Sequence, residues 1–390
     1  MEWVEKKSSE LYVSSSGLSK SSDQFGYGYP FLSYKDVFNN YYAPDKLSTL
    51  VNSTEKDRMK CSVKQGDVFL TRTSETTDEL GMSCVALHDY VNATFNGFTK
   101  RLRPLTDEIE PKYAAYYFRS PYFRSQCISL ASLITRASLN DGMIRRLKIR
   151  YPLNRKVQEK IGEILYTYDT LIENNTKRIR LLEKMAENLY KEWFVRFRFP
   201  GHENVEKENG LPKGWKYVNF SNLSPILTGK KDANYASQNG KYKFFTCSKN
   251  DLVADNYSFD CFAIILAGNG DLNVKLYDGQ FEAYQRTYVL SPYDVEHIYV
   301  SYYTIQSELD RLLVGAAGAV IKFLTKGMIE KIKVLLPTND VLVRFNSIQE
   351  HNYRLRQNLK RQNSLLARQR DLLLPRLMSG KLEVKEELLE

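Results

Sequence analysis

A short segment occurs twice in this chain, 185 residues apart, and this repeat constrains the fold more than any other feature. Residues 142–149 read GMIRRLKI and are followed by Pro152. Residues 327–334 read GMIEKIKV and are followed by Pro337. Each copy predicts a glycine turn and a short alternating strand, with the proline leading into a long helical pattern. The chain is therefore interpreted as a tandem duplication, in which a variable block and a basic helix are each present twice.

Positive charge is concentrated in the same repeated regions. The chain of 390 residues has a net charge of +10, to which residues 141–200 contribute +6 and residues 326–381 contribute +8. The intervening residues 1–140 and 201–325 are close to neutral, at +1 and −2. Basic segments of this kind favour nucleic-acid binding, although a solvated basic face would give the same balance.

Two long amphipathic patterns follow the repeated segments, from about 154 to 197 and from about 340 to 374, where Pro375 is expected to end the second helix. Apolar residues recur in steps of three and four over about five heptads, which is typical of a coiled coil. We expect the two helices to pair antiparallel with pseudo-two-fold symmetry; the alternative is that each helix lies on its own domain. The expected pairing residues are Val157, Ile161, Ile164, Tyr168, Leu171, Ile179, Leu182 and Leu189 on the first helix, and Leu342, Phe345, Ile348, Leu355, Leu359, Leu366 and Leu373 on the second.

The variable blocks are predicted to be mixed α/β (α+β) domains. Apolar or aromatic runs predict strands at 67–71, 241–246, 262–267 and 288–290, and helical patterns occur at 113–119 and 302–313. The chain is predicted to consist of five parts: a first domain at 1–150, a central helix at 151–200, a second domain at 201–336, a distal helix at 337–380 and an acidic tail at 381–390.

Patterns that would indicate other classes of protein are missing from the sequence. The five cysteines are scattered without a C-x-x-C pair, and the four histidines have no metal-ligand spacing. The sequence contains no phosphate-binding G-x-x-x-x-G-K-[ST] loop and no apolar run long enough to cross a bilayer. We therefore expect a cytoplasmic protein that holds no metal or cofactor of its own and is not an enzyme.

Four motifs carry a resemblance to a known family. Residues 171–175 read LIENN, residues 189–201 read LYKEWFVRFRFPG, residues 211–215 read LPKGW, and residues 372–382 read LLLPRLMSGKL. In combination they resemble the specificity (S) subunit of type I restriction-modification systems, over essentially the whole chain. One departure is at the N-terminus. The family often begins with an L-P-x-G-W-like opening, whereas this chain begins Met1-Glu2-Trp3, in which Trp3 corresponds to the tryptophan of that motif.

The resemblance implies a non-catalytic subunit that reads double-stranded DNA. The two mixed domains would be target recognition domains that read the two unlike halves of a bipartite, asymmetric site, held apart by the coiled coil. Two methyltransferase (M) subunits would bind the chain and supply S-adenosylmethionine chemistry, and restriction (R) subunits would bring ATP and Mg²⁺. Trp193, Phe194 and Phe197 are expected to help dock the methyltransferase subunits, or alternatively to cap the helix against the second domain.

Side-chain chemistry and position next to predicted strands and turns indicate which residues could contact DNA. Arginine, lysine, asparagine and glutamine read base edges, while lysine, arginine and small hydroxyls contact phosphates. The candidates are Lys20, Ser22, Arg72, Ser74, Lys100 and Arg101 in the first domain, and Lys230, Lys231, Lys249, Asn250, Asn269, Gln285 and Arg286 in the second.

Two other functions were considered. A coiled-coil scaffold that assembles partners without reading DNA would account for the helices, whereas a fused methyltransferase would need a catalytic domain for which two repeats leave no room. Because the presumed reading domains are nearly neutral, we expect the chain alone to bind DNA weakly and with strong salt dependence.

Overall fold

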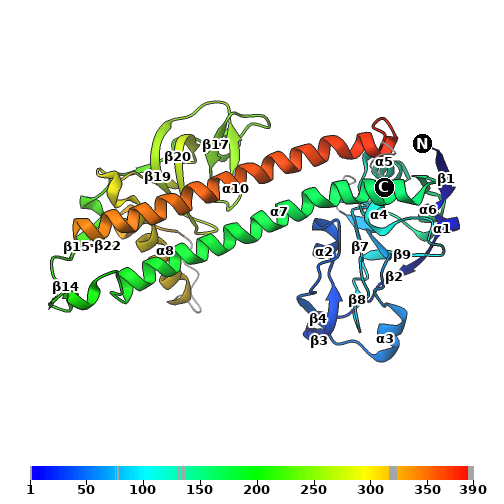
Figure 1. Ribbon diagram of the computed structural model, residues 1–390, viewed down its shortest axis with the longest axis horizontal. Helices are drawn as coiled ribbons and strands as arrows, with labels where there is room; N and C mark the ends of the chain where they lie inside the picture. The colour runs from blue at the N-terminus through cyan, green and yellow to red at the C-terminus, as the bar shows by residue number, and fades with distance from the viewer. Residues whose placement is uncertain are drawn as a thin grey trace. The chain divides into compact units, whose positions relative to one another are not determined.

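The computed structural model describes residues 2–74, 76, 79–130, 132–133, 137–315 and 323–384. It contains two compact units, shown together in Figure 1: unit 1 comprises Met1–Thr176 and Lys360–Glu390, and unit 2 comprises Lys177–Leu359. Each unit holds one mixed α/β block together with part of helix α7 (Arg155–Tyr190) and part of helix α10 (Asn339–Ser379). The predicted class of mixed α/β domains with two long helices is confirmed. The functional division into recognition domains and spacers stays a prediction.

Unit 1 is built around an antiparallel sheet in the order β2-β9-β5-β7. A second sheet has the order β4-β3-β8, and β1 pairs with β12. The strands described in unit 1 are β1 (Trp3–Lys7), β2 (Tyr12–Ser16), β3 (Phe25–Leu32), β4 (Thr49–Val51), β5 (Val68–Thr71), β6 (Thr73–Ser74), β7 (Ser83–Val85), β8 (Thr94–Phe95), β9 (Thr99–Pro104), β10 (Ser132–Leu133), β11 (Ala137–Ser138) and β12 (Lys148–Pro152). Its shorter helices are α1 (Ser8–Leu11), α2 (Tyr34–Asn39), α3 (Glu55–Lys60), α4 (Pro111–Tyr117), α5 (Pro121–Leu130) and α6 (Asp141–Arg146), with a 3₁₀ turn η1 (Ser22–Gln24).

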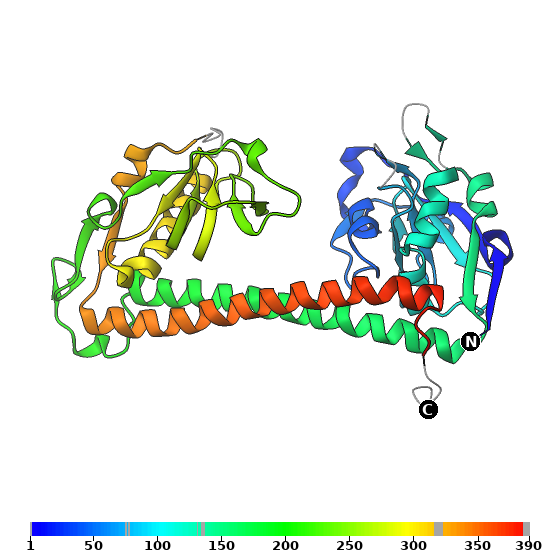
Figure 2. The same cartoon turned by 90° about the horizontal axis from the view of Figure 1, so that it is seen from above.

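Unit 2 contains a larger sheet in the order β16-β21-β19-β20-β17-β18. Its strands are β13 (Lys207–Glu208), β14 (Leu211–Pro212), β15 (Lys216–Asn219), β16 (Ile226–Thr228), β17 (Tyr242–Phe245), β18 (Leu252–Ala254), β19 (Phe259–Ala267), β20 (Val274–Ala283), β21 (Thr287–Leu290) and β22 (Lys333–Leu336). Its other elements are the helices α8 (Ile298–Gly315) and α9 (Lys326–Glu330), the π-helical turn η3 (Lys191–Val195) and the 3₁₀ turns η4 (His202–Asn204), η5 (Phe220–Asn222), η6 (Ala233–Tyr235) and η7 (Val295–His297). Helix α8 lies between the sheet and the long helices (Figure 2).

The two units share one sheet topology. The order β16-β21-β19-β20 in unit 2 repeats β2-β9-β5-β7 in unit 1, and all the pairings are antiparallel. A glycine follows the first strand of each set. A Cβ on Gly17 would lie 2.2 Å from the carbonyl oxygen of Asn96, and a Cβ on Gly229 would lie 1.9 Å from that of Ala283. Only glycine permits this backbone approach. It brings the loop after the first strand against the residues that precede the neighbouring strand, β9 in unit 1 and β21 in unit 2.

The repeated sequence segments occupy equivalent places, but their first residues form helix where a glycine turn was predicted. Gly142 lies in α6 and Gly327 in α9, each of which begins at a capping side chain, Asn140 or Thr325. The capping hydrogen bonds to backbone N–H groups outweigh the low helix propensity of glycine. The strands β12 and β22 then follow, as predicted, and pair with β1 and β15.

In unit 1 the first half of α7 packs antiparallel against the last part of α10 (Figure 1). Val157 and Ile161 share a core with Leu377 of α10. Farther along, Asp169 pairs with Arg370, and the Asn175 side-chain amide donates to Gln362 Oε1 over 3.3 Å. Residue numbers rise on one helix as they fall on the other, so the antiparallel pairing is confirmed in this unit.

In unit 2 the end of α7 packs antiparallel against the start of α10. The side-chain amide of Asn352 donates to the carbonyl oxygen of Leu182 over 3.0 Å, and that of Gln349 donates to the carbonyl oxygen of Ala186 over 3.3 Å. The ring of Phe345 lies 5.8 Å from that of Trp193. The two long helices therefore contact each other in both units, and the alternative of two separate helices is wrong. The two-fold relation between the repeats stays a prediction.

Most residues of the predicted helix seam are wholly or partly shielded from solvent. Those that are buried are Val157, Ile161, Ile179, Leu342, Phe345 and Leu359, and those half-buried are Ile164, Tyr168, Leu182, Leu189, Leu355, Leu366 and Leu373. Two expectations are wrong: Leu171 is 45% exposed and Ile348 is 47% exposed. A straight α-helix drifts by about 20° per heptad relative to a 3.5-residue repeat, so the contact face moves to neighbouring residues. Gln349, for example, is buried beside Ile348.

Helix α10 also runs beyond the predicted stop at Pro375, as far as Ser379. A proline inside a helix removes one backbone hydrogen bond and normally favours termination. Here Leu374, Leu377 and Met378 are buried in the core of unit 1. Burial of three large apolar side chains, at about 1.5–3 kcal/mol each, outweighs the lost bond.

The close approach at Gly229 generates a stability prediction. Gly229→Ala should lower the free energy of unfolding by about 1–3 kcal/mol, because the new methyl group would overlap backbone atoms of Ala283 that cannot rotate away. Gly327→Ala is the matched control: no atom lies within 4 Å of its added Cβ, and alanine favours helix, so stability should stay equal or rise by about 0.5–1 kcal/mol. Urea unfolding of both variants measures the difference, and equal stabilities would contradict the packing argument.

Candidate nucleic-acid interface

Four loops of unit 2 meet at one end of its sheet, and they carry the residues predicted to contact DNA in the second domain. The backbone N–H of Gln285 donates to the carbonyl oxygen of Lys231 over 2.9 Å. The N–H of Gly268, which precedes Asn269, donates to the carbonyl oxygen of Arg286 over 2.9 Å. The thiol of Cys247, in the turn that continues to Lys249 and Asn250, lies 3.4 Å from the same oxygen. The structure therefore brings these separate sequence positions together.

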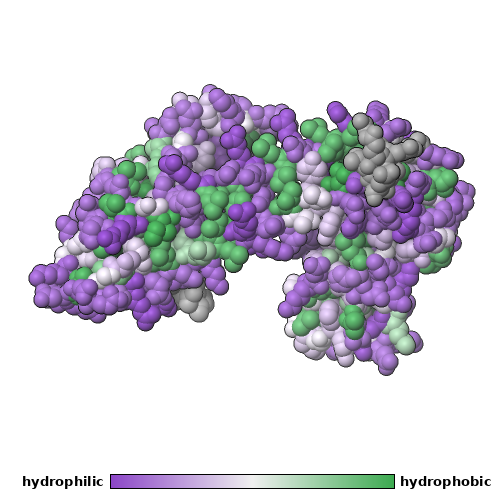
Figure 3. All heavy atoms as spheres, in the orientation of Figure 1, coloured by the Kyte–Doolittle hydropathy of each residue, from purple (hydrophilic) through white to green (hydrophobic). Residues whose placement is uncertain are grey.

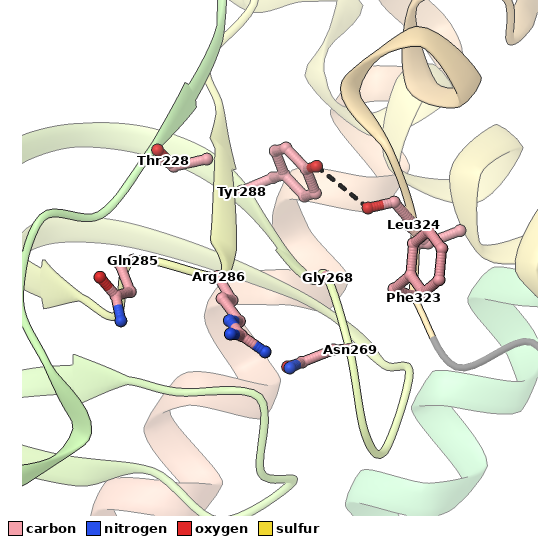
Figure 4. A pocket seen from close by; sticks show the side chains of 8 residues that line it. All are labelled: Thr228, Gly268, Asn269, Gln285, Arg286, Tyr288, Phe323 and Leu324. Carbon is pink, nitrogen blue, oxygen red and sulfur yellow. Dashed lines mark hydrogen bonds between the residues drawn. The ribbon is translucent and has the colours of Figure 1, made fainter.

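Three of the candidates line one pocket of about 460 Å³ (Figure 4). The Arg286 side chain points toward Asn269, and Gln285 comes from the same turn as Arg286. Tyr288 donates its hydroxyl hydrogen to the carbonyl oxygen of Leu324 over 3.1 Å, which closes one side of the pocket. The residues that line it are Thr228, Gly268, Asn269, Gln285, Arg286, Tyr288, Phe323 and Leu324.

Sequence reasoning missed Thr228, Tyr288 and Phe323 in this pocket. Thr228 and Tyr288 lie on β16 and β21, opposite each other in register and close to the predicted loops, so strand pairing was the missing information. Phe323 is 62% exposed and forms a bridge with Asn269 from more than fifty positions away. Nothing in the local pattern around Phe323 indicated that contact.

The pocket combines the groups that distinguish nucleobases. Side-chain amides such as those of Asn269 and Gln285 can pair with the two adjacent hydrogen-bonding groups of adenine. The guanidinium of Arg286 can pair with the two acceptors of guanine, and Arg286 is exposed. Aromatic rings add stacking surface, and the hydroxyl of Thr228 can donate or accept.

The remaining candidates of unit 2 surround the pocket. Lys230, Lys249 and Asn250 are exposed. Lys231 is half-buried, with its ammonium 4.3 Å from the centre of the Tyr235 ring. Exposed lysines beside a pocket of this composition suit contacts to phosphates.

In unit 1 the candidates occupy the equivalent end of the sheet but are more strongly engaged with the protein itself. Lys20, after β2, forms a 3.1 Å ion pair with Asp57, while Ser22 is exposed in η1. Arg72 is half-buried after β5. Ser74 is buried and donates its hydroxyl hydrogen to Glu79 over 2.7 Å, which leaves it poorly placed to contact DNA.

Lys100 and Arg101, predicted as phosphate contacts, are buried in unit 1, so that prediction is wrong for the folded chain. Both lie inside β9. The ammonium of Lys100 contacts both carboxylate oxygens of Asp141 at 2.9 Å. Arg101 donates to the carbonyl oxygen of Ser62 over 2.6 Å. Strand pairing places both side chains against neighbouring elements, which local sequence did not indicate.

The Lys100–Asp141 pair generates a pH prediction. Partial burial acts to raise the pKa of Asp141, but hydrogen bonds from Lys100 and Ser14 hold that pKa below its ordinary value of 3.8. Because the folded pKa is depressed, the stabilisation is present above pH 3.8 and is lost as pH falls through the folded pKa. Asp141→Asn should therefore lower the free energy of unfolding by about 2 kcal/mol at pH 7. This loss is smaller than the loss on breaking a fully buried ion pair, because the Asp141 side chain is 52% exposed.

Urea unfolding at pH 7 and at pH 3 checks this expectation. The difference between the wild type and Asp141→Asn should narrow at the lower pH. Asp45→Asn is the control, because the Asp45 side chain is 99% exposed and its stability effect should not follow this pattern. A difference that is the same at both pH values would contradict the assigned role of the carboxylate.

The predicted docking residues lie largely inside unit 2. Trp193 and Phe194 are 5% and 4% exposed, in a core that also contains Trp215 and Phe345. Phe197 is half-buried, with its ring 5.9 Å from that of Trp215. These side chains cap helix α7 against the second domain, as the alternative interpretation proposed. At such low exposure, Trp193 and Phe194 are not available to a partner. The prediction that these two residues dock a methyltransferase subunit is therefore wrong.

Trp193→Ala should accordingly lower the stability of unit 2 by about 3–5 kcal/mol, the usual loss for removing a large buried aromatic side chain. Val195→Ala is the control from the same π-helical turn; Val195 is 58% exposed, and its substitution should change stability by less than about 0.5 kcal/mol. Thermal unfolding measures both. A stable Trp193→Ala variant would return this tryptophan to the candidates for docking.

Hydrophilic and hydrophobic residues are unevenly distributed over the visible face of unit 2 (Figure 3). On the face of unit 2 seen in Figure 3, the surface over β17, β19 and β20 is largely hydrophilic, while hydrophobic residues gather over the helices. Among the described residues, no group of three or more histidine, cysteine, aspartate or glutamate side chains could hold a metal ion. In the same part of the chain, none of the helices combines the length and apolarity needed to span a bilayer.

Known proteins similar to this chain share both sequence and fold with it. The family described as type I restriction modification DNA specificity domain matches residues 2–184. The EcoDI type I restriction enzyme specificity subunit of Escherichia coli is 38% identical over 128 residues, 33% of this chain and 29% of that protein. The MjaIX type I restriction enzyme specificity subunit of Methanocaldococcus jannaschii is 24% identical over 416 residues, 99% of this chain and 94% of that protein.

A solved structure gives an independent comparison of the fold. The type I restriction-modification S subunit from M. genitalium matches with a TM-score of 0.61 at 15% identity, covering 96% of each chain. The family match spans the first copy of the internal repeat, and the similarity to the archaeal subunit extends through the second. By the family match over residues 2–184 and by sequence similarity along almost its whole length, this chain resembles the specificity (S) subunits of type I restriction-modification systems.

Proposed function

We propose that each unit reads one half of a bipartite, asymmetric DNA target, and that the paired helices α7 and α10 act as the ruler between the halves. The observation that carries this proposal is the convergence of Asn269, Gln285 and Arg286 on one pocket at the end of the unit 2 sheet. These three residue types are the ones that pair bidentately with adenine and guanine edges. A scaffold protein would have no use for that combination in one place.

The two halves of the target should differ because the two sheet ends differ in chemistry. Unit 2 presents two amides and an exposed guanidinium. At the corresponding end of unit 1, Ser22 is exposed and Arg72 is half-buried. Different donors and acceptors select different bases, so one target recognition domain is not interchangeable with the other.

Catalysis in this proposal belongs to partner subunits. Two methyltransferase subunits would bind the chain and bring S-adenosylmethionine, and restriction subunits would bring ATP and Mg²⁺; the chain itself would hold no cofactor and act in the cytoplasm. The similarity to specificity subunits of type I restriction enzymes supports these assignments. The internal pairing of several lysines further supports weak, salt-sensitive DNA binding by the chain alone, tightened by its partners.

Substitutions in the pocket test the reading role. Arg286→Ala and Asn269→Ala should each relax the sequence requirement at one position in one half-site, with a loss of discrimination of about 1–3 kcal/mol. Lys230→Ala is the matched control: loss of a phosphate contact should weaken binding evenly across sequences and reduce the salt slope by about 0.9. Methylome sequencing of cells that carry the whole system with each variant measures the change in sequence requirement, and a binding titration at several salt concentrations measures the salt slope.

Exchange of residues 1–140 for the corresponding segment of another specificity subunit separates reading from scaffolding. A reader should change one half of the methylated sequence and retain the other, whereas a scaffold would leave the whole sequence unchanged. Methylation at an unaltered target after the exchange would overturn the proposal.

A further inference from the structure

Two lysines and one aspartate form a cluster beside the unit 2 pocket that the proposed reading role does not use. Lys243 of β17 contacts Asp251 at 2.8 Å, and Lys275 of β20 contacts the other carboxylate oxygen of Asp251 at 2.7 Å. Lys275 also donates to the carbonyl oxygen of Ser248 over 2.9 Å, in the turn that carries Lys249. The cluster therefore adjoins the loops of the candidate interface.

The cluster is held in place by its surroundings. The ammonium groups of Lys243 and Lys275 lie 5.9 and 5.6 Å from the centre of the Phe245 ring. The side chains of Lys243, Lys275 and Asp251 are 44%, 20% and 28% exposed, so all three keep some access to solvent. Burial acts to raise the pKa of Asp251, but hydrogen bonds from both lysines hold that pKa below its ordinary value. The carboxylate is thus ionised at neutral pH and cancels one of the two positive charges.

Aspartate also neutralises lysines in unit 1. Lys20 pairs with Asp57, and Lys100 pairs with Asp141. Both lysines come from positions where sequence alone suggested contacts to DNA. The same arrangement therefore occurs in both units, whose mixed α/β blocks are nearly neutral in net charge.

We propose that Asp251 is a specificity-determining residue, which keeps Lys243 and Lys275 from contacting DNA phosphates and so keeps sequence-independent affinity low. Phosphate contacts are the same for every sequence and strengthen binding to wrong sites as much as to the right one. A lysine already neutralised by a carboxylate releases fewer counterions from DNA when it approaches. This inference rests on the proposed function, because it requires the unit 2 sheet end to face DNA.

Asp251→Asn in the full-length chain tests the inference. Freed lysines should tighten binding to a random-sequence duplex and steepen the slope of log affinity against log salt by about 0.9 for each lysine that reaches a phosphate. If both lysines reach a phosphate, the affinity of Asp251→Asn relative to that of the wild type should fall about tenfold between 50 and 200 mM salt. Fluorescence anisotropy across that salt range measures the slope, and circular dichroism verifies folding.

Two further variants make the result specific. Asp260→Asn removes the same charge from an exposed aspartate of unit 2 whose side-chain partner is the Gln280 amide, and it should leave the slope unchanged. The triple variant Asp251→Asn, Lys243→Gln and Lys275→Gln should return the slope to the wild-type value or below. A merely structural salt bridge would give no such reversal.

The outcomes separate failure of the inference from failure of the proposed function. A steeper slope for Asp251→Asn alone supports the inference. Equal changes in Asp251→Asn and Asp260→Asn would indicate a bulk charge effect, and an unchanged slope would show that the lysines do not reach phosphates; either result overturns the inference and leaves DNA reading intact. If neither the wild type nor any variant binds duplex DNA at low salt, the proposed function itself fails.

Discussion

The antiparallel contact between α7 and α10 is the constraint on which the rest of the structure depends. It is fixed less by its apolar residues than by polar side chains that have one partner each. Asn175 contacts Gln362 in unit 1, and Asn352 contacts the Leu182 carbonyl in unit 2. Sliding one helix past the other would leave these buried amides without partners, whereas leucines would repack against other leucines. Polar contacts therefore set the register that each mixed domain is built on.

Each domain is joined to the long helices through tyrosines on a helix that lies between the sheet and the helix pair, α4 in unit 1 and α8 in unit 2. In unit 1 Tyr116 of α4 donates to Asp169 of α7. In unit 2 Tyr303 of α8 donates to Gln349 of α10 over 3.0 Å, and Tyr190 of α7 pairs with Thr304 over 3.0 Å. Buried hydroxyls with specific partners orient the helix as well as stabilise it. The sheet end that carries the proposed base-reading groups is thus positioned through packing that starts at the long helices.

Sequence alone predicted the features that depend on periodicity. The repeat, the two long helices and most strands were correct because three-four and alternating patterns report directly on which face is buried. It failed where a contact comes from far along the chain. The burial of Lys100 and the contact of Phe323 with Asn269 could not be predicted. Strand β9, which contains Lys100, and Phe323 obtain these neighbours only when distant parts of the chain pair in the folded sheet. A second repeat, in which Tyr113, Tyr116 and Tyr117 match Tyr299, Tyr302 and Tyr303, was within reach of sequence comparison and was missed.

The division of the chain into units also has a consequence for the order of synthesis. Unit 2 is a single continuous stretch, Lys177–Leu359, whereas the core of unit 1 includes Leu374, Leu377 and Met378 from the far end of the chain. A ribosome delivers residues in sequence, and domains fold as they emerge. Unit 2 is complete while the final helical turns of α10 are still being made. Of the two units, the one that begins earlier in the chain is therefore the last to be completed, because its core also requires the turns that contain Leu374, Leu377 and Met378.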